Sequence, residues 1–171
     1  MAICFELVLN FGDNVEAAQA AARTDTKPWV LNAGGHRIPL HRPLLSTLGS
    51  NIELTILPVA VGWGVGLDGS LPRFPLTAAE FTELGHHLYD LLAQLDGYVT
   101  AKVGWDVEAL LDPAELKAEW SQELADGSLD GLVISDSLRG ELELSDNYVP
   151  FQPGYCWIPY RGEVPSSLTA D

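Results

Sequence analysis

Basic residues are scarce in this sequence. It holds nine lysines and arginines against 24 aspartates and glutamates, so its formal net charge at pH 7 is -15. Phosphate contacts made by Lys and Arg dominate the affinity of nucleic-acid-binding proteins, so we expect no binding to DNA or RNA. The deficit is uneven, because residues 1–75 hold five basic and six acidic residues, whereas residues 76–171 hold four and eighteen. Such an acidic half suits a basic protein partner, a cation, or solubility alone.

Cysteines and long apolar runs are scarce as well. Cys4 and Cys156 are the only cysteines and form no C-x-x-C pair, which favours a soluble cytoplasmic protein with reduced thiols; one disulfide between the terminal segments is the alternative. The uncharged run from Leu54 to Leu67, which no other uncharged run exceeds in length, is too short and too rich in glycine to cross a bilayer, which takes about 20 apolar residues. The N-terminal MAICFELVLNF carries Glu6 and no basic start, so it indicates a strand rather than a signal peptide.

Motifs for catalysis are absent too. The chain has no G-x-S-x-G, no H-E-x-x-H and no P-loop, so the sequence predicts a protein without catalytic activity and without a cofactor. Adjacent histidines on a helix point about 100° apart, so His86 and His87 are not expected to share a metal ion. We therefore expect no metal site.

One glycine pattern does invite a functional interpretation. VGWGVGLDG, residues 61–69, contains G-x-G-x-x-G, which cradles phosphates where a strand turns into a helix. Here two prolines, Pro72 and Pro75, follow the glycines, and no helix is expected before Thr77. We interpret the glycines as a bare strand face that lets another segment pack closely, with a ligand groove as the alternative.

The remaining sequence predicts a single α+β domain. Thr77 and Glu80 form a capping-box pattern that opens the clearest helix, residues 77–95, with Leu76 and Phe81 at the staple positions. Asp112, followed by Pro113, opens a further helix that ends near Gly127. The other predicted elements are a helix at 13–23 capped by Asp13, a short edge strand within 36–42, strands at 2–11 and 98–107, and a hairpin made of 132–135 and 141–144. Residues 52–67 are predicted to form one strand, or two strands broken near Pro58.

The order of these elements suggests a fold. We expect a mixed or antiparallel sheet with about three helices, built on a ferredoxin-like β-α-β-β-α-β core and continued by a C-terminal α-β-β extension. A generic α+β sheet with helices on one face is the alternative. Within the single domain, residues 1–171, the core is 1–108, the acidic helix and hairpin are 109–147, and a tail rich in proline and aromatics, 148–171, packs on the core.

A basic cluster provides the candidate ligand site. Four of the nine basic residues lie between Arg23 and Arg42, beside Gly34-Gly35. An arginine fork with a histidine can hold an anionic group, so we expect a pocket between the 34–42 segment and the Gly62–Gly66 strand face. The alternative is an edge segment whose charges face water. The residues assigned to this pocket are His36, Arg37, His41, Arg42 and Trp63.

Two other stretches are candidate partner surfaces. Glu115, Glu119 and Glu123 stand four residues apart, on one expected helical ridge that would meet a basic surface. The tail contributes Phe151, Tyr155 and Trp157, either as an exposed aromatic patch or as a strap that closes the core. The leading hypothesis is a non-catalytic interaction module that binds a basic protein or a second copy of itself, with no nucleic acid and no membrane. A small-molecule binder or enzyme acting on an anionic ligand is the alternative.

Overall fold

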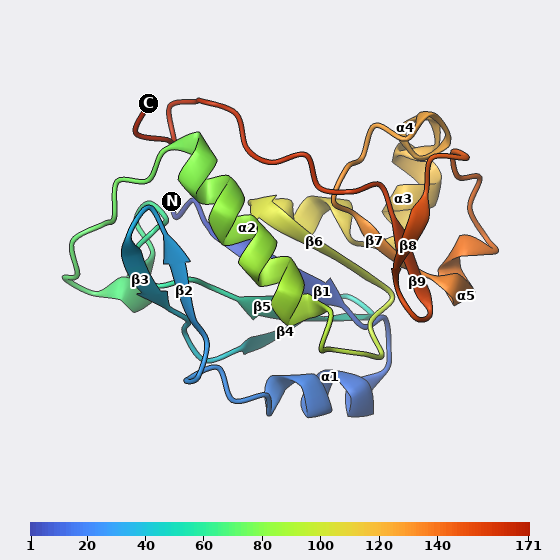
Figure 1. Cartoon of the computed structure of the whole chain (residues 1–171). Coiled ribbons are helices and arrows are strands. Elements are labelled where there is room, and N and C mark those ends of the chain that lie inside the picture. Colours follow the sequence, from blue (N-terminus) through green and yellow to red (C-terminus); the bar gives the residue numbers. More distant parts are fainter.

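The chain folds into a seven-stranded antiparallel sheet, a separate two-stranded hairpin and five α-helices (Figure 1). The computed structural model describes residues 1–171. In chain order the elements are β1 (Phe5–Asn10), α1 (Val15–Ala22), β2 (Val30–Ala33), β3 (His36–Pro39), β4 (Leu44–Leu48), β5 (Asn51–Ile56), the 3-10 helix η1 (Gly66–Asp68), α2 (Ala78–Leu92), β6 (Thr100–Trp105), the 3-10 helix η2 (Val107–Leu110), α3 (Pro113–Glu119), α4 (Ser121–Asp126), β7 (Val133–Ser135), α5 (Asp136–Arg139), β8 (Val149–Gln152) and β9 (Tyr155–Trp157).

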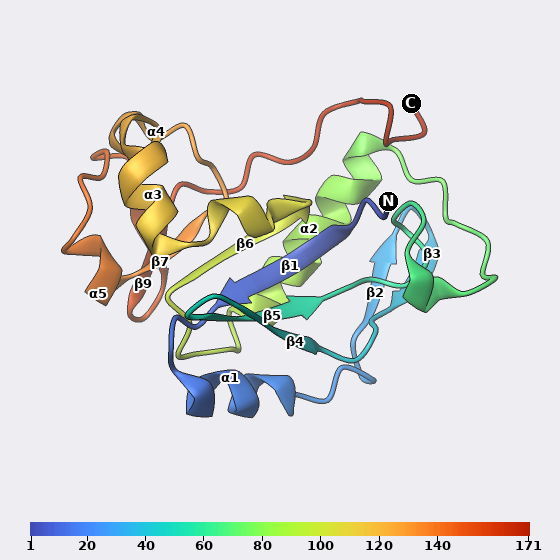
Figure 2. The same ribbon diagram turned by 180° about the vertical axis from the view of Figure 1, so that it is seen from behind.

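The sheet has the strand order β4-β5-β1-β6-β7-β9-β8 and is covered on both faces. Phe5, Leu7 and Leu9 of β1 point into the larger core cluster, which includes the apolar stripe of α2 and the alanines of α1. Val8 points the other way, into a smaller cluster shared with α3, α4 and α5. Figure 2 shows α3 and α4 in front of the sheet and α2 behind it. The alternation of a strand's side chains therefore separates the two cores.

Helix α2 follows the sequence signals closely. Thr77 accepts a hydrogen bond from the Glu80 backbone, and the Glu80 side chain accepts one from the Thr77 backbone, which confirms the capping box. Leu76 and Phe81 are both buried, as the staple pattern predicts. The apolar stripe of α2 covers the centre of the sheet. No helix in the structure is both long and apolar enough to cross a membrane.

The edge of the sheet differs from the sequence-based prediction. Residues 36–39 do form a strand, but it pairs with β2 in the separate hairpin, where Gly34 and Gly35 make the turn with φ of +56° and +78°. The edge strands of the main sheet are β4 and β8, and neither was predicted from the sequence as an edge strand. The predicted strand 52–67 ends at Ile56, and beyond it only isolated bridges occur, at Pro58 and Trp63.

The C-terminal region also differs in detail. The helix that begins after Asp112 breaks at Trp120, so it becomes α3 and α4. The stretch 141–144 forms no strand, because Ser135 caps the single turn of α5 and redirects the chain. Strand β7 pairs instead with β9, so the aromatic tail supplies the last two strands of the sheet. In α1 the capping residue is Asn14 rather than Asp13.

The α+β class is therefore confirmed. The order of the core elements can also be compared with the predicted ferredoxin-like core. If the β2–β3 hairpin is set aside as an insertion, β1, α1, β4, β5, α2 and β6 follow the order β-α-β-β-α-β, with strand neighbours β4-β5-β1-β6. Nothing in this order conflicts with the predicted ferredoxin-like core. The strand at its outer edge is β4 rather than the segment 36–42.

Candidate functional site

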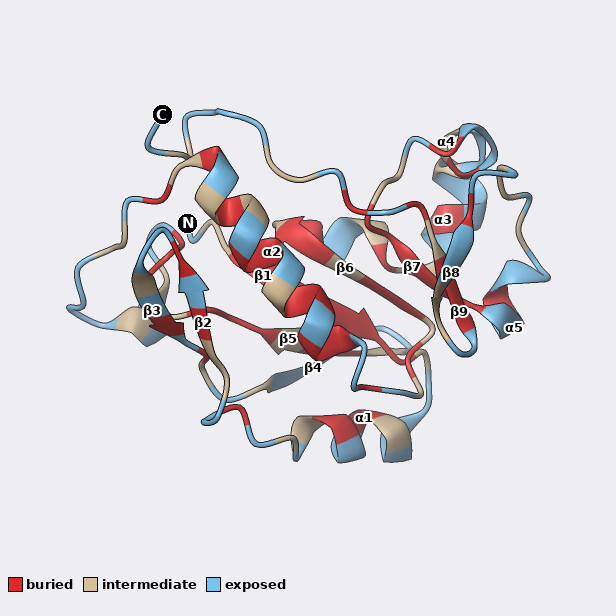
Figure 3. Ribbon diagram, viewed as in Figure 1, coloured by how far each residue is buried: buried red, intermediate tan, exposed pale blue.

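Strand β4 forms an open edge of the main sheet. It pairs only with β5, and all five of its residues are exposed (Figure 3). Its sequence, LLSTL, contains no charge and no proline, and the leucines Leu44, Leu45 and Leu48 are 40%, 43% and 53% exposed. Proteins usually protect edge strands with charges, prolines or bulges, because a bare edge pairs with other chains. The residues of β4 itself carry none of these protections.

The register shows which backbone groups of β4 are available. Ile52, opposite Thr47, exchanges its backbone hydrogen bonds with the loop after β1, at Phe11 and Gly12. Antiparallel pairs alternate between hydrogen-bonded and non-hydrogen-bonded, so Thr47 and Leu45 turn their N–H and C=O groups away from β5. Two donors and two acceptors therefore face outward, in the geometry that a further strand needs.

A basic depression lies at the start of this edge. Its volume is about 370 Å³, and Arg23, Lys27 and Arg42 line it together with one acid, Asp25. The Asp25 carboxylate accepts the backbone N–H of Lys27 at 3.0 Å, so part of its hydrogen-bonding capacity is already used. Arg42 and Pro43 lead directly into Leu44. Three of the nine basic residues of this acidic chain thus surround one hollow beside the open edge.

Only one of the residues predicted for the anionic pocket lines this depression. Arg42 does, whereas Arg37 is exposed on β3 and His36 packs against Phe74 with ring centroids 4.9 Å apart. His41 lies with its Nε2 2.7 Å from the Asp68 carboxylate. Trp63 carries the Arg73 guanidinium over its ring, at 3.7 Å from the centroid. The five predicted residues therefore do not line one common pocket.

The glycine-rich stretch is not a strand face. A Cβ on Gly62 would lie 2.7 Å from the Ile3 carbonyl oxygen, and one on Gly64 would lie 3.1 Å from that of Met1. The stretch thus packs closely against the first residues of the chain, and Gly66 begins η1 instead of a phosphate-binding helix. Close packing, the preferred interpretation of these glycines, is what the structure shows for Gly62 and Gly64.

The acidic candidates occupy two helices instead of one. Glu115 and Glu119 are exposed on α3, and Glu123 is half-buried on α4, beyond the break at Trp120. Lys117, on the same helix as the first two, donates to Glu141 at 2.9 Å. The three carboxylates therefore share no single helical ridge, although two of them remain on the surface.

The aromatic residues of the tail pack onto the protein. Tyr155 is buried, stacks on Tyr98 at 4.1 Å between ring centroids, and donates to the Tyr98 carbonyl. Phe151 and Trp157 are half-buried and contact each other and Tyr89. These contacts correspond to the strap that closes the core.

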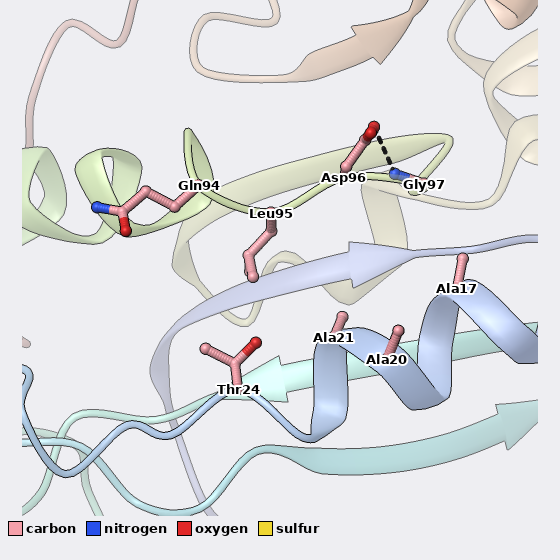
Figure 4. A pocket seen from close by; sticks show the side chains of 8 residues that line it. All are labelled: Ala17, Ala20, Ala21, Thr24, Gln94, Leu95, Asp96 and Gly97. Atoms are coloured by element: carbon pink, nitrogen blue, oxygen red, sulfur yellow. Dashed lines mark hydrogen bonds between the residues drawn. The ribbon is translucent and has the colours of Figure 1, made fainter.

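A second hollow lies between α1 and the α2–β6 connection. It measures about 370 Å³, and Figure 4 shows that alanines of α1 line one side and the residues from Gln94 to Gly97 line the other. Its one charged side chain, Asp96, already accepts hydrogen bonds from the Gly97 N–H and from the Tyr155 hydroxyl. We assign no ligand to this hollow.

Two buried carboxylates escaped the sequence analysis. Glu6 on β1 and Glu53 on β5 are 7% and 4% exposed, on the sheet face opposite α2, and no Lys, Arg or His lies within ion-pair distance. Burial, helped by the charges of Glu108 and Asp106, raises the pKa of Glu6 to about 7. Burial and Glu108 also raise the pKa of Glu53. No three His, Cys, Asp or Glu side chains form a group that could hold a metal ion.

Comparison with known proteins adds no functional assignment. No protein-family model, no curated protein and no solved structure matches the chain. The open edge of β4 and the basic depression beside it are the features of the molecule that point to a function.

Proposed function

We propose that this protein is an interaction module that binds an extended segment of a partner protein as an additional strand on β4. The observation that carries the proposal is the uncharged, exposed edge strand in which Leu45 and Thr47 turn their backbone N–H and C=O groups outward. Strand addition uses the backbone hydrogen bonds of the edge for affinity and its alternating side chains for specificity. The three exposed leucines favour a partner segment with apolar side chains.

The basic depression adds a requirement on charge. Arg23, Lys27 and Arg42 surround the hollow where β4 begins, so the partner segment carries an acidic group at the end that lies beside Pro43. An arginine binds a carboxylate or phosphate with two parallel hydrogen bonds, which fixes the register of the added strand. The rest of the chain is strongly acidic and disfavours long acidic partners, so a single anionic group suits the site best.

Selection from a library of short random peptides tests this function. We expect the selected peptides to combine alternating apolar residues with one Asp or Glu near an end. Their binding should slow hydrogen exchange at the Leu45 and Thr47 amides, which face outward in the free protein. Failure to select any peptide, or selected peptides that leave both amides unprotected, would contradict strand addition.

Two matched pairs of variants sharpen the test. Thr47→Pro removes an outward N–H without removing a hydrogen bond of the sheet, so the protein should fold but lose the peptides. Thr47→Val keeps the N–H and the shape of the side chain, so it should bind normally. Arg42→Ala should weaken peptides that carry the acid by about tenfold, whereas Arg139→Ala, a change on distant α5, should not.

The functions inferred from the sequence predict other outcomes. If Glu115, Glu119 and Glu123 meet a basic partner, selection yields basic peptides whose binding falls steeply with salt and survives Thr47→Pro. If β4 pairs with a second copy, the free protein sediments as a dimer that Thr47→Pro converts to a monomer. If the depression serves a small anion instead, binding needs Arg42 and no peptide backbone.

A further inference from the structure

A polar cavity lies where strands β6 and β7 part. The two strands pair only at Thr100 and Ala101, so the second half of β6 has no strand neighbour on that side. The cavity between this half, η2 and the C-terminal segment measures about 300 Å³. Among the residues that line it are Lys102, Gly104, Leu110, Asp130, Tyr160 and Glu163. It uses no residue of β4 or of the basic depression.

Lys102 supplies the positive charge of this cavity. Its Nζ donates to the Asp130 backbone carbonyl at 2.6 Å, and no carboxylate oxygen lies within ion-pair distance. An ammonium group has three N–H donors, so two of them have no partner in the protein. Burial lowers the pKa of Lys102, which reflects the cost of holding this charge away from water.

Asp130 and Glu163 supply two negative charges. Asp130 accepts the Arg161 backbone N–H through Oδ2 at 2.9 Å, and Glu163 accepts the Tyr160 hydroxyl through Oε1 at 2.9 Å. The second oxygen of each carboxylate has no hydrogen-bond donor in the protein. The Glu163 backbone N–H donates to the Thr82 hydroxyl on α2, which fixes the backbone at Glu163 relative to α2. The cavity therefore offers free donors and free acceptors together.

This combination of charges selects one class of small ligand. A simple anion would meet Lys102 but also two carboxylates, and a simple amine would meet the carboxylates but also the ammonium of Lys102. A ligand that carries one charge of each sign satisfies both groups. A cavity of this volume lies at the lower end of ligand sites and so takes a small molecule.

We propose that the cavity binds a free α-amino acid, with its carboxylate on Lys102 and its ammonium on Glu163 and Asp130. Leu110 and Trp105 form an apolar part of the lining, which favours an amino acid with an apolar side chain. This site is independent of strand addition on β4, so one can fail without the other.

Calorimetric titration of the full chain with the proteinogenic amino acids tests the proposal. We expect at least one apolar amino acid to bind. For leucine, the matched probes are 3-methylbutan-1-amine, which lacks the carboxylate, and 4-methylpentanoate, which lacks the ammonium; each should bind at least about tenfold more weakly. Equal binding of either probe, or no binding by any amino acid, overturns the proposal.

Variants and chemical labelling locate the binding. Lys102→Met and Glu163→Gln should each lower the affinity by about tenfold or more, whereas Lys117→Met, which removes an exposed lysine, should leave it unchanged. Should Lys102→Met fail to fold, acylation of the wild-type lysines gives the same information. A bound amino acid should slow acylation of Lys102 but not of Lys27 or Lys117, and equal rates at all three lysines with and without ligand would overturn the assignment.

Discussion

The imidazole Nε2 of His41 lies 2.7 Å from Oδ1 of Asp68. The same oxygen accepts the backbone N–H of Ala60 at 3.0 Å, and Ala60 has a φ of +59°. One carboxylate of the glycine-rich stretch therefore connects the end of the β2–β3 hairpin to the strained turn after β5. The stretch 61–69, whose glycine pattern resembles a phosphate-binding loop, thus contains the carboxylate that holds these two segments together.

Replacing Asp68 with alanine should destabilise the protein. The change removes two hydrogen bonds to a half-buried carboxylate and leaves the Ala60 N–H without a partner, a loss of about 2 kcal/mol. Urea denaturation followed by tryptophan fluorescence gives the free energy of unfolding. Asp146→Ala, at an exposed position, is the control and should leave the midpoint unchanged. Equal midpoints for both variants would show that the Asp68 contacts contribute nothing.

Glu6 should make the protein less stable as the pH rises. Its pKa is raised from 4.5 to about 7, so the folded protein keeps the proton that the unfolded chain releases above pH 4.5. The contribution of Glu6 to the free energy of unfolding is therefore fully present below pH 4.5. It is lost, by about 3 kcal/mol, as the pH rises through 7. Glu6→Gln stays neutral, so its melting temperature should exceed that of the wild type at pH 8 but not at pH 4. Glu143→Gln, on the surface, should change neither value, and an identical pH profile for Glu6→Gln would refute the prediction.

Two glycine-to-alanine changes should differ in their effect on stability. Alanine normally stabilises a helix by about 1 kcal/mol over glycine, but a Cβ on Gly85 of α2 would lie 2.6 Å from the Tyr160 hydroxyl oxygen and 2.8 Å from two atoms of its ring. Gly85→Ala should therefore lower the melting temperature. Gly140 has an ordinary φ of -64° and its new Cβ would be 4.0 Å from its nearest neighbour, so Gly140→Ala should be neutral or stabilising. A stabilised Gly85→Ala would mean that the tyrosine moves away at little cost.

The cap of α1 can be tested with two adjacent residues. The Asn14 side chain accepts the Ala17 N–H at 3.1 Å, whereas no hydrogen bond involves the Asp13 side chain. Asn14→Ala should cost about 1 kcal/mol of unfolding free energy, and Asp13→Ala should cost little. Chemical denaturation of the two variants in parallel measures both values. A larger loss of unfolding free energy in Asp13→Ala than in Asn14→Ala would show that Asp13 caps the helix.

The elements that could be predicted from sequence are those with local signals. The capping box at Thr77, the apolar stripe of α2 and Pro113 at the start of α3 each act within a few residues, and the structure contains all three features. Strand β4 has no such signal, because LLSTL shows no clear alternation of polar and apolar residues. The pairing of β7 with β9 could not be predicted either. Strand β9 lies about twenty residues further along, and the nearer stretch 141–144 has the alternating pattern of a hairpin strand.

The candidate sites show the same division. The basic residues Arg23, Lys27 and Arg42 are close enough in sequence to suggest one cluster, and they do surround one depression. Lys102 and Glu163 stand 61 positions apart and belong to no motif, so only the path of the C-terminal segment brings them to one cavity. A site assembled from distant residues leaves no spacing in the sequence from which it could be recognised.

The sequence by itself determined the α+β class, the position of the main helix, the acidity of the second half and the clustering of the few basic residues. These features depend on composition and on spacing over a few residues, and neither depends on the rest of the chain. Tertiary structure alone decided that β4 is an open edge, that the aromatic tail completes the sheet, and that Lys102, Asp130 and Glu163 line one cavity. These outcomes depend on which strands pair and where they part, and strand pairing is settled by burial and hydrogen bonding between segments far apart in the chain.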